Sequence, residues 1–227
     1  MSALHSVRVP DSVNSELAAL AEPLAVGLKL LNHAQVQPTE RLLVIGAGPI
    51  GLAVVLWARQ YAVGDILVSD PVRSRQSLAL QLGATAVVDP TRESLTEACA
   101  RELGGLPEAV IECVGRPGLL QSAAEVVAPY GRLILAGLHF ESDTIARFEP
   151  LMKEITIKFS NFTVKRDFTH TLNLLGQGRL DPLPLITHRF GLDELPETVR
   201  ALRTPNEFGK VLISPSLSSV RGPPTRP

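Results

Sequence analysis

The stretch RLLVIGAGPIGLAVVLWARQYA, residues 41–62, carries most of the information about the fold. Its first part is a short, continuous apolar run, which is typical of a buried strand, and its last part has the length and composition of a helix. Between them lies the glycine-rich turn Gly46-Ala47-Gly48-Pro49-Ile50-Gly51. A GxGxxG pattern is informative in this context, where a strand passes directly into a helix.

Each glycine of this turn has its own physical reason. Gly46 permits the tight turn, and Gly48 lets the backbone approach a pyrophosphate because no Cβ atom stands in the way. Gly51 lets the helix pack closely on the sheet. The helix that starts at Pro49 and Ile50 offers N–H groups and a partial positive charge to phosphates. The turn therefore predicts a dinucleotide site, and a glycine-rich turn that binds nothing is the structural alternative.

Short apolar runs and helical patterns alternate after this turn. Further strands are predicted at 65–70, 84–90, 109–115, 131–138 and 155–163, and helices at 49–62, 73–83, 94–105 and 117–131. Because the apolar runs are continuous, the sheet should be covered on both faces. The pattern predicts an α/β fold with a doubly wound parallel sheet, the Rossmann fold, and flanking helices from an incomplete second domain.

Asp70 ends the second predicted strand, about 20 residues after the glycine turn, where such sheets place an acidic residue. Its carboxylate can accept hydrogen bonds from the adenosine ribose and repel a 2′-phosphate, which favours NAD over NADP. Arg73 and Arg75 act against this preference because arginine pairs with phosphate. A solvated aspartate at a strand end is the structural alternative.

A methyltransferase is the competing class of protein. It also combines a glycine-rich first turn with an acidic residue at the end of the second strand. The complete third glycine, Gly51, and the uninterrupted helix after it favour a dinucleotide instead.

Two flanks frame the predicted sheet. Residues 17–34 are expected to form an amphipathic helix pair broken at Pro23, because the residue before a proline avoids the helical conformation. After the sheet, the expected order is helix 167–178, strand 184–191, helix 192–203 and strand 209–215. The predicted domains are a junction with a linking helix at 1–39, the dinucleotide-binding domain at 40–165, C-terminal helices with a closing strand at 166–215, and a disordered tail at 216–227.

Composition excludes several kinds of partner. The chain has 227 residues and a formal net charge of -1, so neither nucleic acid nor an anionic membrane surface is expected to bind it. Cys99 and Cys113 are the two cysteines, which give no disulfide framework and indicate a reducing compartment, so we expect a cytoplasmic protein. Residues 42–58 carry no charge, but three glycines and a proline lie in the middle of this stretch, so a turn is expected there and a membrane span is not.

Several segments together resemble the zinc-type medium-chain alcohol and polyol dehydrogenases, with the sorbitol dehydrogenase branch nearest. They are EPLAVGLKLL (22–31), LLVIGAGPIGL (42–52), VIECVG (110–115), LILAGL (133–138) and PLITHRFGLDELPE (184–197). The resemblance implies a Rossmann domain, NAD, a secondary alcohol or polyol substrate and zinc-assisted hydride transfer. It also implies that the GroES-like lobe, which holds the catalytic zinc in such enzymes, is missing from these residues.

The same resemblance implies roles for individual residues. Ile50 would touch the cofactor, and Asp70 and Arg75 would hold the adenosine ribose. The nicotinamide half would be lined by backbone groups of Ala136, Gly137 and Leu138, with Phe162 approaching from the next strand. In the polyol branch an arginine follows that phenylalanine, whereas Thr163 stands there in this sequence.

Glu22 matches a Glu-Pro pair that lies at the catalytic zinc in the polyol branch, directly or through water. Zinc acidifies the alcohol bound to it, but a catalytic site takes at least three protein ligands. The family supplies the others from a cysteine and a Gly-His-Glu segment, and this sequence has no His-Glu pair. Glu22 is thus the one metal candidate, and zinc binding by this chain is not expected. The alternative is that the Glu22 carboxylate stands at the start of a helix and interacts with the helix dipole.

Two functions remain open at this point. The first is the NAD(H)-binding portion of an oxidoreductase acting on a secondary alcohol or polyol. The second is a non-catalytic dinucleotide-binding or oligomerisation module left by truncation. No catalytic residue is assigned, since His33, His139 and His170 show no ligand spacing and His188, in a segment that resembles the family, is expected to be structural. The chain is expected to be inactive alone.

The segment ITIKFSNF, residues 155–162, is expected at the edge of the sheet. An apolar edge exposes unpaired N–H and C=O groups that can pair with another strand. The resembling dehydrogenases join two six-stranded sheets at this edge across a two-fold axis. A homodimer is therefore the expected assembly.

Overall fold

A computed structural model describes residues 6–204 and 206–215 and shows a six-stranded parallel sheet in the order β3-β2-β1-β4-β5-β6. The strands are β1 (Arg41–Ile45), β2 (Asp65–Ser69), β3 (Ala86–Val88), β4 (Ala109–Glu112), β5 (Arg132–Leu135) and β6 (Thr156–Phe159). The strand order reverses between β1 and β4, and ligands of such sheets bind at the carboxyl ends of the strands beside this point. The predicted doubly wound α/β fold is confirmed.

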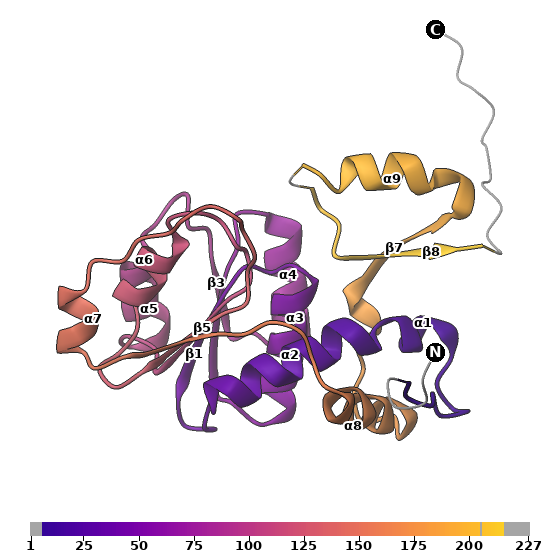
Figure 1. Ribbon diagram of the computed structural model, residues 1–227, viewed down its shortest axis with the longest axis horizontal. Helices are drawn as coiled ribbons and strands as arrows, with labels where there is room; N and C mark the ends of the chain where they lie inside the picture. Colours follow the sequence, from indigo (N-terminus) through magenta and orange to yellow (C-terminus); the bar gives the residue numbers. More distant parts are fainter. Residues whose placement is uncertain (1–5, 205, 216–227) are drawn as a thin grey trace, which may run out of the picture.

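Helices cover both faces of this sheet (Figure 1). One face carries α2 (Ala21–Ala34), α3 (Pro49–Gln60) and α4 (Arg73–Leu82), and the other carries α5 (Leu95–Leu103) and α6 (Leu119–Glu125). Trp57 of α3 is fully buried, and its indole N–H donates a hydrogen bond to the Leu24 carbonyl at 2.7 Å. This bond joins α3 to α2 within one core.

The expected break at Pro23 is wrong. The short helix α1 (Ser15–Ala19) ends at Leu20, and Pro23 lies inside the first turn of α2. The first N–H groups of a helix have no intrahelical acceptor, so a proline there costs no hydrogen bond. Glu22 occupies the same first turn.

Local sequence signals at two helix ends are borne out. Gly83 caps α4 in the left-handed conformation, with φ of 114°. Ser94 caps α5, and its reciprocal hydrogen bonds with Glu97 form the expected capping box. Strand β6 is shorter than the predicted 155–163, because the chain after Phe159 turns onto α2.

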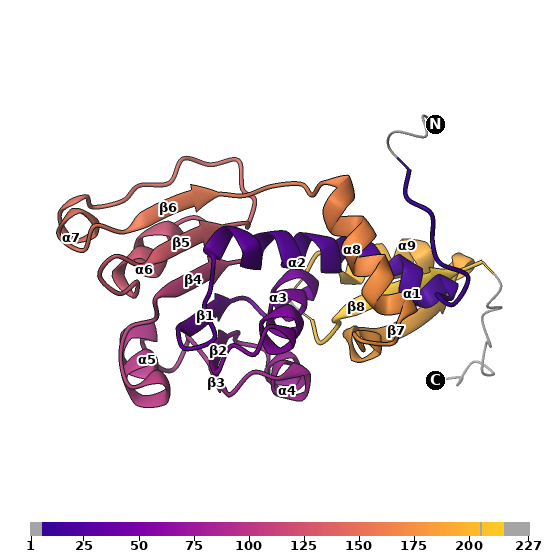
Figure 2. The same cartoon turned by 90° about the horizontal axis from the view of Figure 1, so that it is seen from below.

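The last part of the chain forms a second, smaller unit (Figures 1 and 2). Strands β7 (Ile186–Gly191) and β8 (Lys210–Ser214) pair in a two-stranded parallel sheet. Helix α9 (Leu195–Ala201) belongs to this unit, with 3-10 turns η2 (Leu183–Leu185) and η3 (Leu192–Glu194). Helix α8 (Lys165–Gly176) packs on α2, and helix α7 (Phe148–Met152) precedes β6 and packs on α6. The tail predicted at 216–227 lies outside the described residues.

Among the helices of residues 6–204 and 206–215, none combines the length and the apolar character that crossing a bilayer requires.

Candidate functional site

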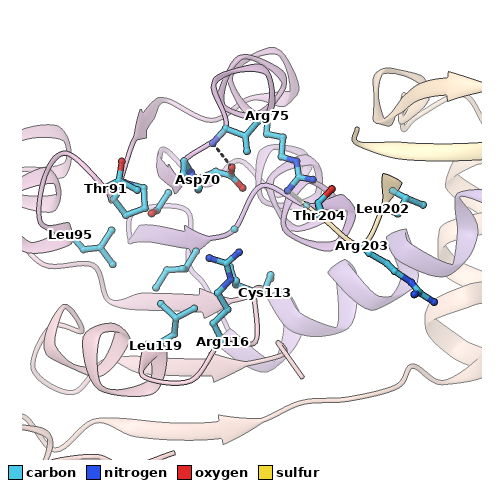
Figure 3. A pocket seen from close by; sticks show the side chains of 18 residues that line it. Asp70, Arg75, Thr91, Leu95, Cys113, Arg116, Leu119, Leu202, Arg203 and Thr204 are labelled. Atoms are coloured by element: carbon cyan, nitrogen blue, oxygen red, sulfur yellow. Dashed lines mark hydrogen bonds between the residues drawn. The ribbon is translucent and has the colours of Figure 1, made fainter. Parts of the chain in front are cut away.

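A cavity of about 460 Å³ lies at the carboxyl ends of β1, β2 and β4. Asp70 and Arg75 stand on one side of it, and Arg116 and Leu119 stand on the opposite side (Figure 3). This is the edge of the sheet at which the strand order reverses. We call it the adenosine-side cavity.

The glycine turn forms the floor of the adenosine-side cavity. Gly46 has a positive φ of 96°, and its N–H donates to the Ser69 carbonyl at 2.7 Å. A Cβ atom on Gly51 would stand 1.9 Å from the Gly46 carbonyl oxygen, so the turn closes only with glycine there. A Cβ atom on Gly48 would meet nothing within 4 Å, which leaves open space above this residue for a ligand.

Helix α3 starts directly at this floor. Pro49 occupies its first turn, and the first intrahelical bond runs from the Leu52 N–H to the Gly48 carbonyl at 2.9 Å. The N–H groups of Ile50 and Gly51 precede that bond and are available to an anion. Helix N-termini of this kind bind phosphate groups.

Asp70 is buried, with 4% of its surface exposed. Its Oδ2 accepts the Ala47 N–H at 2.8 Å, and its Oδ1 accepts the Val72 N–H at 2.8 Å. One carboxylate thereby ties the glycine turn to the start of α4. The structure does not support a freely solvated aspartate at this strand end.

Arginine side chains supply positive charge around the adenosine-side cavity. Arg75 lines it, and the Nε atom of Arg75 is buried without a hydrogen-bond partner in the described part of the chain. Arg116 lies four residues beyond the end of β4 and also lines the cavity; the sequence analysis did not assign it, although its position directly after the apolar run VIECVG was a usable signal. Thr204 reaches the cavity from beyond α9, and no local sequence pattern could have indicated this long-range contact.

A second cavity of about 320 Å³ shares one lining residue, Cys113, with the first. We call it the nicotinamide-side cavity. It brings together most of the residues predicted for that half of the cofactor and the metal candidate: Glu22, Ile50, Ala136, Leu138 and Phe162. Gly137 is not among its lining residues and lies against the backbone of Gly115 instead.

Cys113 is a packed thiol. Burial raises its pKa strongly, and the neighbouring Glu112 carboxylate raises the pKa further. A thiol with a raised pKa stays protonated at neutral pH and is a weak nucleophile. Covalent catalysis by Cys113 is therefore not supported.

The described residues do not fit a zinc site. No group of three or more His, Cys, Asp or Glu side chains within residues 6–204 and 206–215 is placed to hold a metal ion. Catalytic zinc sites take three protein ligands and one water or substrate molecule. Glu22 reaches the nicotinamide-side cavity, but this part of the chain gives it no partner ligands.

The fold and the glycine turn at the adenosine-side cavity define a class of protein. A sheet in the order 3-2-1-4-5-6, a GxGxxG turn opening α3 and an acidic residue ending β2 are the features of a dinucleotide-binding Rossmann domain.

Comparison with known proteins narrows this class to one family. A family model described as zinc-binding dehydrogenase matches residues 49–177. Human sorbitol dehydrogenase is 31% identical over 199 residues, which cover 86% of this chain and 56% of the relative. The chain belongs to the zinc-binding dehydrogenase family.

Solved structures agree with this assignment. A short chain alcohol dehydrogenase of E. coli CFT073, complexed with NADH, superposes with a TM-score of 0.85 at 26% identity and covers 92% of this chain and 62% of its own. A putative zinc-binding dehydrogenase of Sinorhizobium meliloti 1021, bound to NADP, gives a TM-score of 0.83 at 26% identity, with 92% and 62% covered. The chain spans about half the length of the curated relatives that it matches.

Proposed function

We propose that this chain binds NAD(H) across the two neighbouring cavities, which share Cys113 as a lining residue. It would be the NAD(H)-binding portion of an oxidoreductase that transfers hydride between a secondary alcohol or polyol and NAD. The observation that carries this proposal is that the two cavities lie on either side of Cys113, with Asp70 lining one and Ala136 lining the other. A dinucleotide has two nucleotide halves joined by a pyrophosphate and needs a site of this form.

The described residues supply binding and orientation. Asp70 and Arg75 hold the adenosine ribose, and the amides at the start of α3 hold the pyrophosphate. Ile50, Ala136 and Leu138 give the nicotinamide an apolar wall. The bound nicotinamide supplies the chemistry, which is acceptance or donation of a hydride.

The substrate class is proposed from the relatives. The similarity to human sorbitol dehydrogenase suggests a polyol as the substrate. The similarity to an alcohol dehydrogenase complexed with NADH suggests an alcohol as the substrate and NAD(H) as the cofactor. Because another neighbour is bound to NADP, the preference for NAD rests on Asp70.

Titration with NADH, followed by nicotinamide fluorescence, tests the cofactor proposal. Gly48→Ala should keep the fold, since its Cβ meets open space in the free chain, yet it should weaken NADH binding at least tenfold. Gly64→Ala is the matched control, because its Cβ would make only an ordinary contact at 3.5 Å with the Pro38 carbonyl. Equal NADH affinity in both variants would count against a pyrophosphate over Gly48.

A non-catalytic dinucleotide-binding or oligomerisation module is the second candidate. Metal analysis of the purified chain and a turnover assay with sorbitol and simple secondary alcohols test whether the chain is catalytic by itself. With Glu22 as the single candidate ligand, we expect less than one zinc per chain and no turnover by the chain alone. Stoichiometric zinc with measurable turnover would reveal a complete site and would contradict this expectation.

We further propose a homodimer through β6 and a cytoplasmic location. The edge position of β6 and its exposed Phe159 support the first. The free thiols of Cys99 and Cys113, which suit a reducing compartment, support the second.

A further inference from the structure

Arg73 and Arg75 differ in their surroundings, although both lie in the first turn of α4. Residues two apart on a helix point to different faces. Arg75 lines the adenosine-side cavity, whereas Arg73 is exposed and is not among the residues that line it. The buried Nε atom of Arg75 has no hydrogen-bond partner among residues 6–204 and 206–215. Arg75 therefore brings a positive charge and an unused N–H donor to this wall of the cavity.

The segment after α9 completes this wall. Leu202, Arg203 and Thr204 line the same cavity as Arg75, although they follow a helix of the smaller, C-terminal unit. In Figure 3 the guanidinium group of Arg75 points toward Thr204. The Thr204 hydroxyl donates to the Ala201 carbonyl at 3.3 Å, which is longer than the usual O–H···O distance of about 2.7–2.8 Å, so it can turn toward a ligand. A cation and a hydroxyl donor thus face the same space.

The charges around this space favour an additional anionic group. Asp70 contributes a carboxylate to the lining, and Arg75 and Arg116 contribute two guanidinium groups. The Arg203 side chain extends away from the cavity (Figure 3). Each oxygen of Asp70 accepts a backbone N–H at 2.8 Å, and these groups offset part of its negative charge. Asp70 therefore repels a phosphate less than a free carboxylate does, while its remaining lone pairs can still accept a ribose hydroxyl.

We propose that Arg75 and Thr204 form a subsite for a phosphate group on the 2′-oxygen of the adenosine ribose, so that the chain binds NADP(H) as a second, weaker cofactor. This subsite rests on the proposed function, because it extends the same cofactor site. Arg75 pairs with the phosphate through two parallel N–H···O bonds, a geometry that guanidinium and phosphate groups share. Thr204 donates its hydroxyl to a third phosphate oxygen. NAD(H) remains the preferred cofactor because the Asp70 carboxylate accepts a 2′-hydroxyl and opposes a 2′-phosphate.

Titration of the full chain with NADPH and NADH, followed by nicotinamide fluorescence, tests this subsite. Arg75→Ala should lower NADPH affinity about tenfold or more and NADH affinity less than about threefold, since only the phosphate forms a charge-assisted pair with the guanidinium group. Arg73→Ala is the matched control, because it removes the same charge from the same turn of α4 and should leave the ratio of the two affinities unchanged. Thr204→Val should lower NADPH affinity about threefold, and Thr204→Ser, which keeps the hydroxyl, should retain it.

Adenosine mononucleotides that displace NADH locate the phosphate. In Arg75→Ala, the affinity for 2′,5′-ADP should fall about tenfold or more, whereas the affinities for 3′,5′-ADP and 5′-AMP should fall less than about threefold. A fall for 3′,5′-ADP as large as that for 2′,5′-ADP, or the same fall in NADPH affinity in Arg73→Ala as in Arg75→Ala, would overturn the subsite. A chain that binds NADH but not NADPH would overturn it as well. A chain that binds neither dinucleotide would instead contradict the proposed function.

Discussion

Gly115 and Gly137 lie backbone against backbone, and Gly137 stands in the chain between Ala136 and Leu138 of the nicotinamide-side cavity. A Cβ atom on Gly137 would stand 2.0 Å from the Gly115 amide nitrogen, and one on Gly115 would stand 2.2 Å from the Leu138 amide nitrogen. Glu112 supports this contact from below, because its Oε1 accepts the N–H groups of Val114 and Gly115. The loops after β4 and β5 can approach this closely only because both positions are glycine.

Gly137→Ala should therefore separate the two loops. We expect a loss of about 1–3 kcal/mol in the free energy of unfolding, the usual cost of forcing an extra group into a packed site. NADH affinity should fall as well, because Ala136 and Leu138 would leave their places at the cavity. Urea unfolding and NADH titration measure the two effects, with Gly64→Ala as control. Unchanged stability would contradict this account of the loop contact.

The purified chain should bind NADH more tightly than NADPH. Asp70→Ala should narrow that preference, because the variant lacks the carboxylate that disfavours a 2′-phosphate. It should also lower stability, since each buried N–H left without an acceptor costs about 1–3 kcal/mol and Asp70 satisfies two of them. Asp70→Asn removes the charge but keeps one of the two acceptor oxygens, so it should narrow the preference with a smaller loss of stability than Asp70→Ala. Fluorescence titration measures both affinities, and equal affinities in the unmutated chain would refute this role for Asp70.

Much of the fold could be predicted because its signals are local. The apolar runs of the strands, the glycine turn from Gly46 to Gly51 and the cap at Ser94 each lie within a few neighbouring residues. The break predicted at Pro23 was wrong because the rule for residues before proline weakens in the first turn of a helix.

The rest of the site depends on contacts between distant segments. Gly115 meets Gly137, and His33 meets Ser160, across two loops and a helix that only the folded sheet brings together. The spacing of residues along the sequence does not indicate which distant segments come into contact. The sequence could place Asp70 at the end of β2, but only the structure shows that both of its oxygens accept backbone N–H groups.

Acid should weaken the junction between β1 and β4. Hydrogen bonds from the Arg41 guanidinium lower the pKa of Glu108 to about 2. The pKa of an unfolded glutamate is about 4.3, so the contribution is complete above that pH and is lost as pH falls toward 2. After solvent screening is allowed for, it amounts to about 1 kcal/mol.

Urea unfolding of the unmutated chain and of Glu108→Gln, each at pH 6 and pH 3, measures this contribution. Glutamine does not ionise, so the variant should be less stable at pH 6 and should lose less stability on acidification. Asp11→Asn is the control, because Asp11 pairs with Arg8 at a surface where 92% of the Asp11 side chain is exposed. If Glu108→Gln lost as much stability between pH 6 and pH 3 as the unmutated chain, the acid sensitivity would come from other carboxyl groups.

Strand β6 should mediate self-association, because no strand within residues 6–204 and 206–215 pairs with its outer side. It lies at the edge of the sheet beside β5, and the short helix α7 precedes it (Figure 2). Phe159 of β6 is 78% exposed, and Leu151 and Met152 of α7 are also exposed. An exposed apolar edge with unpaired backbone groups favours pairing with a second copy. A two-fold axis closes such a contact as a dimer.

Proline at position 157 tests this assembly without disrupting the sheet. The N–H groups of Thr156 and Ser160 donate to β5, at 2.9 Å to Gly131 and 2.8 Å to Leu135, so by strand alternation the Ile157 N–H faces the free edge. Ile157→Pro removes this outward donor, whereas Ile157→Val keeps it. Light scattering on fresh protein should show a dimer for the unmutated chain and the valine variant, and a monomer for the proline variant. A monodisperse monomer before mutation, or a dimer that survives the proline, would contradict pairing through β6.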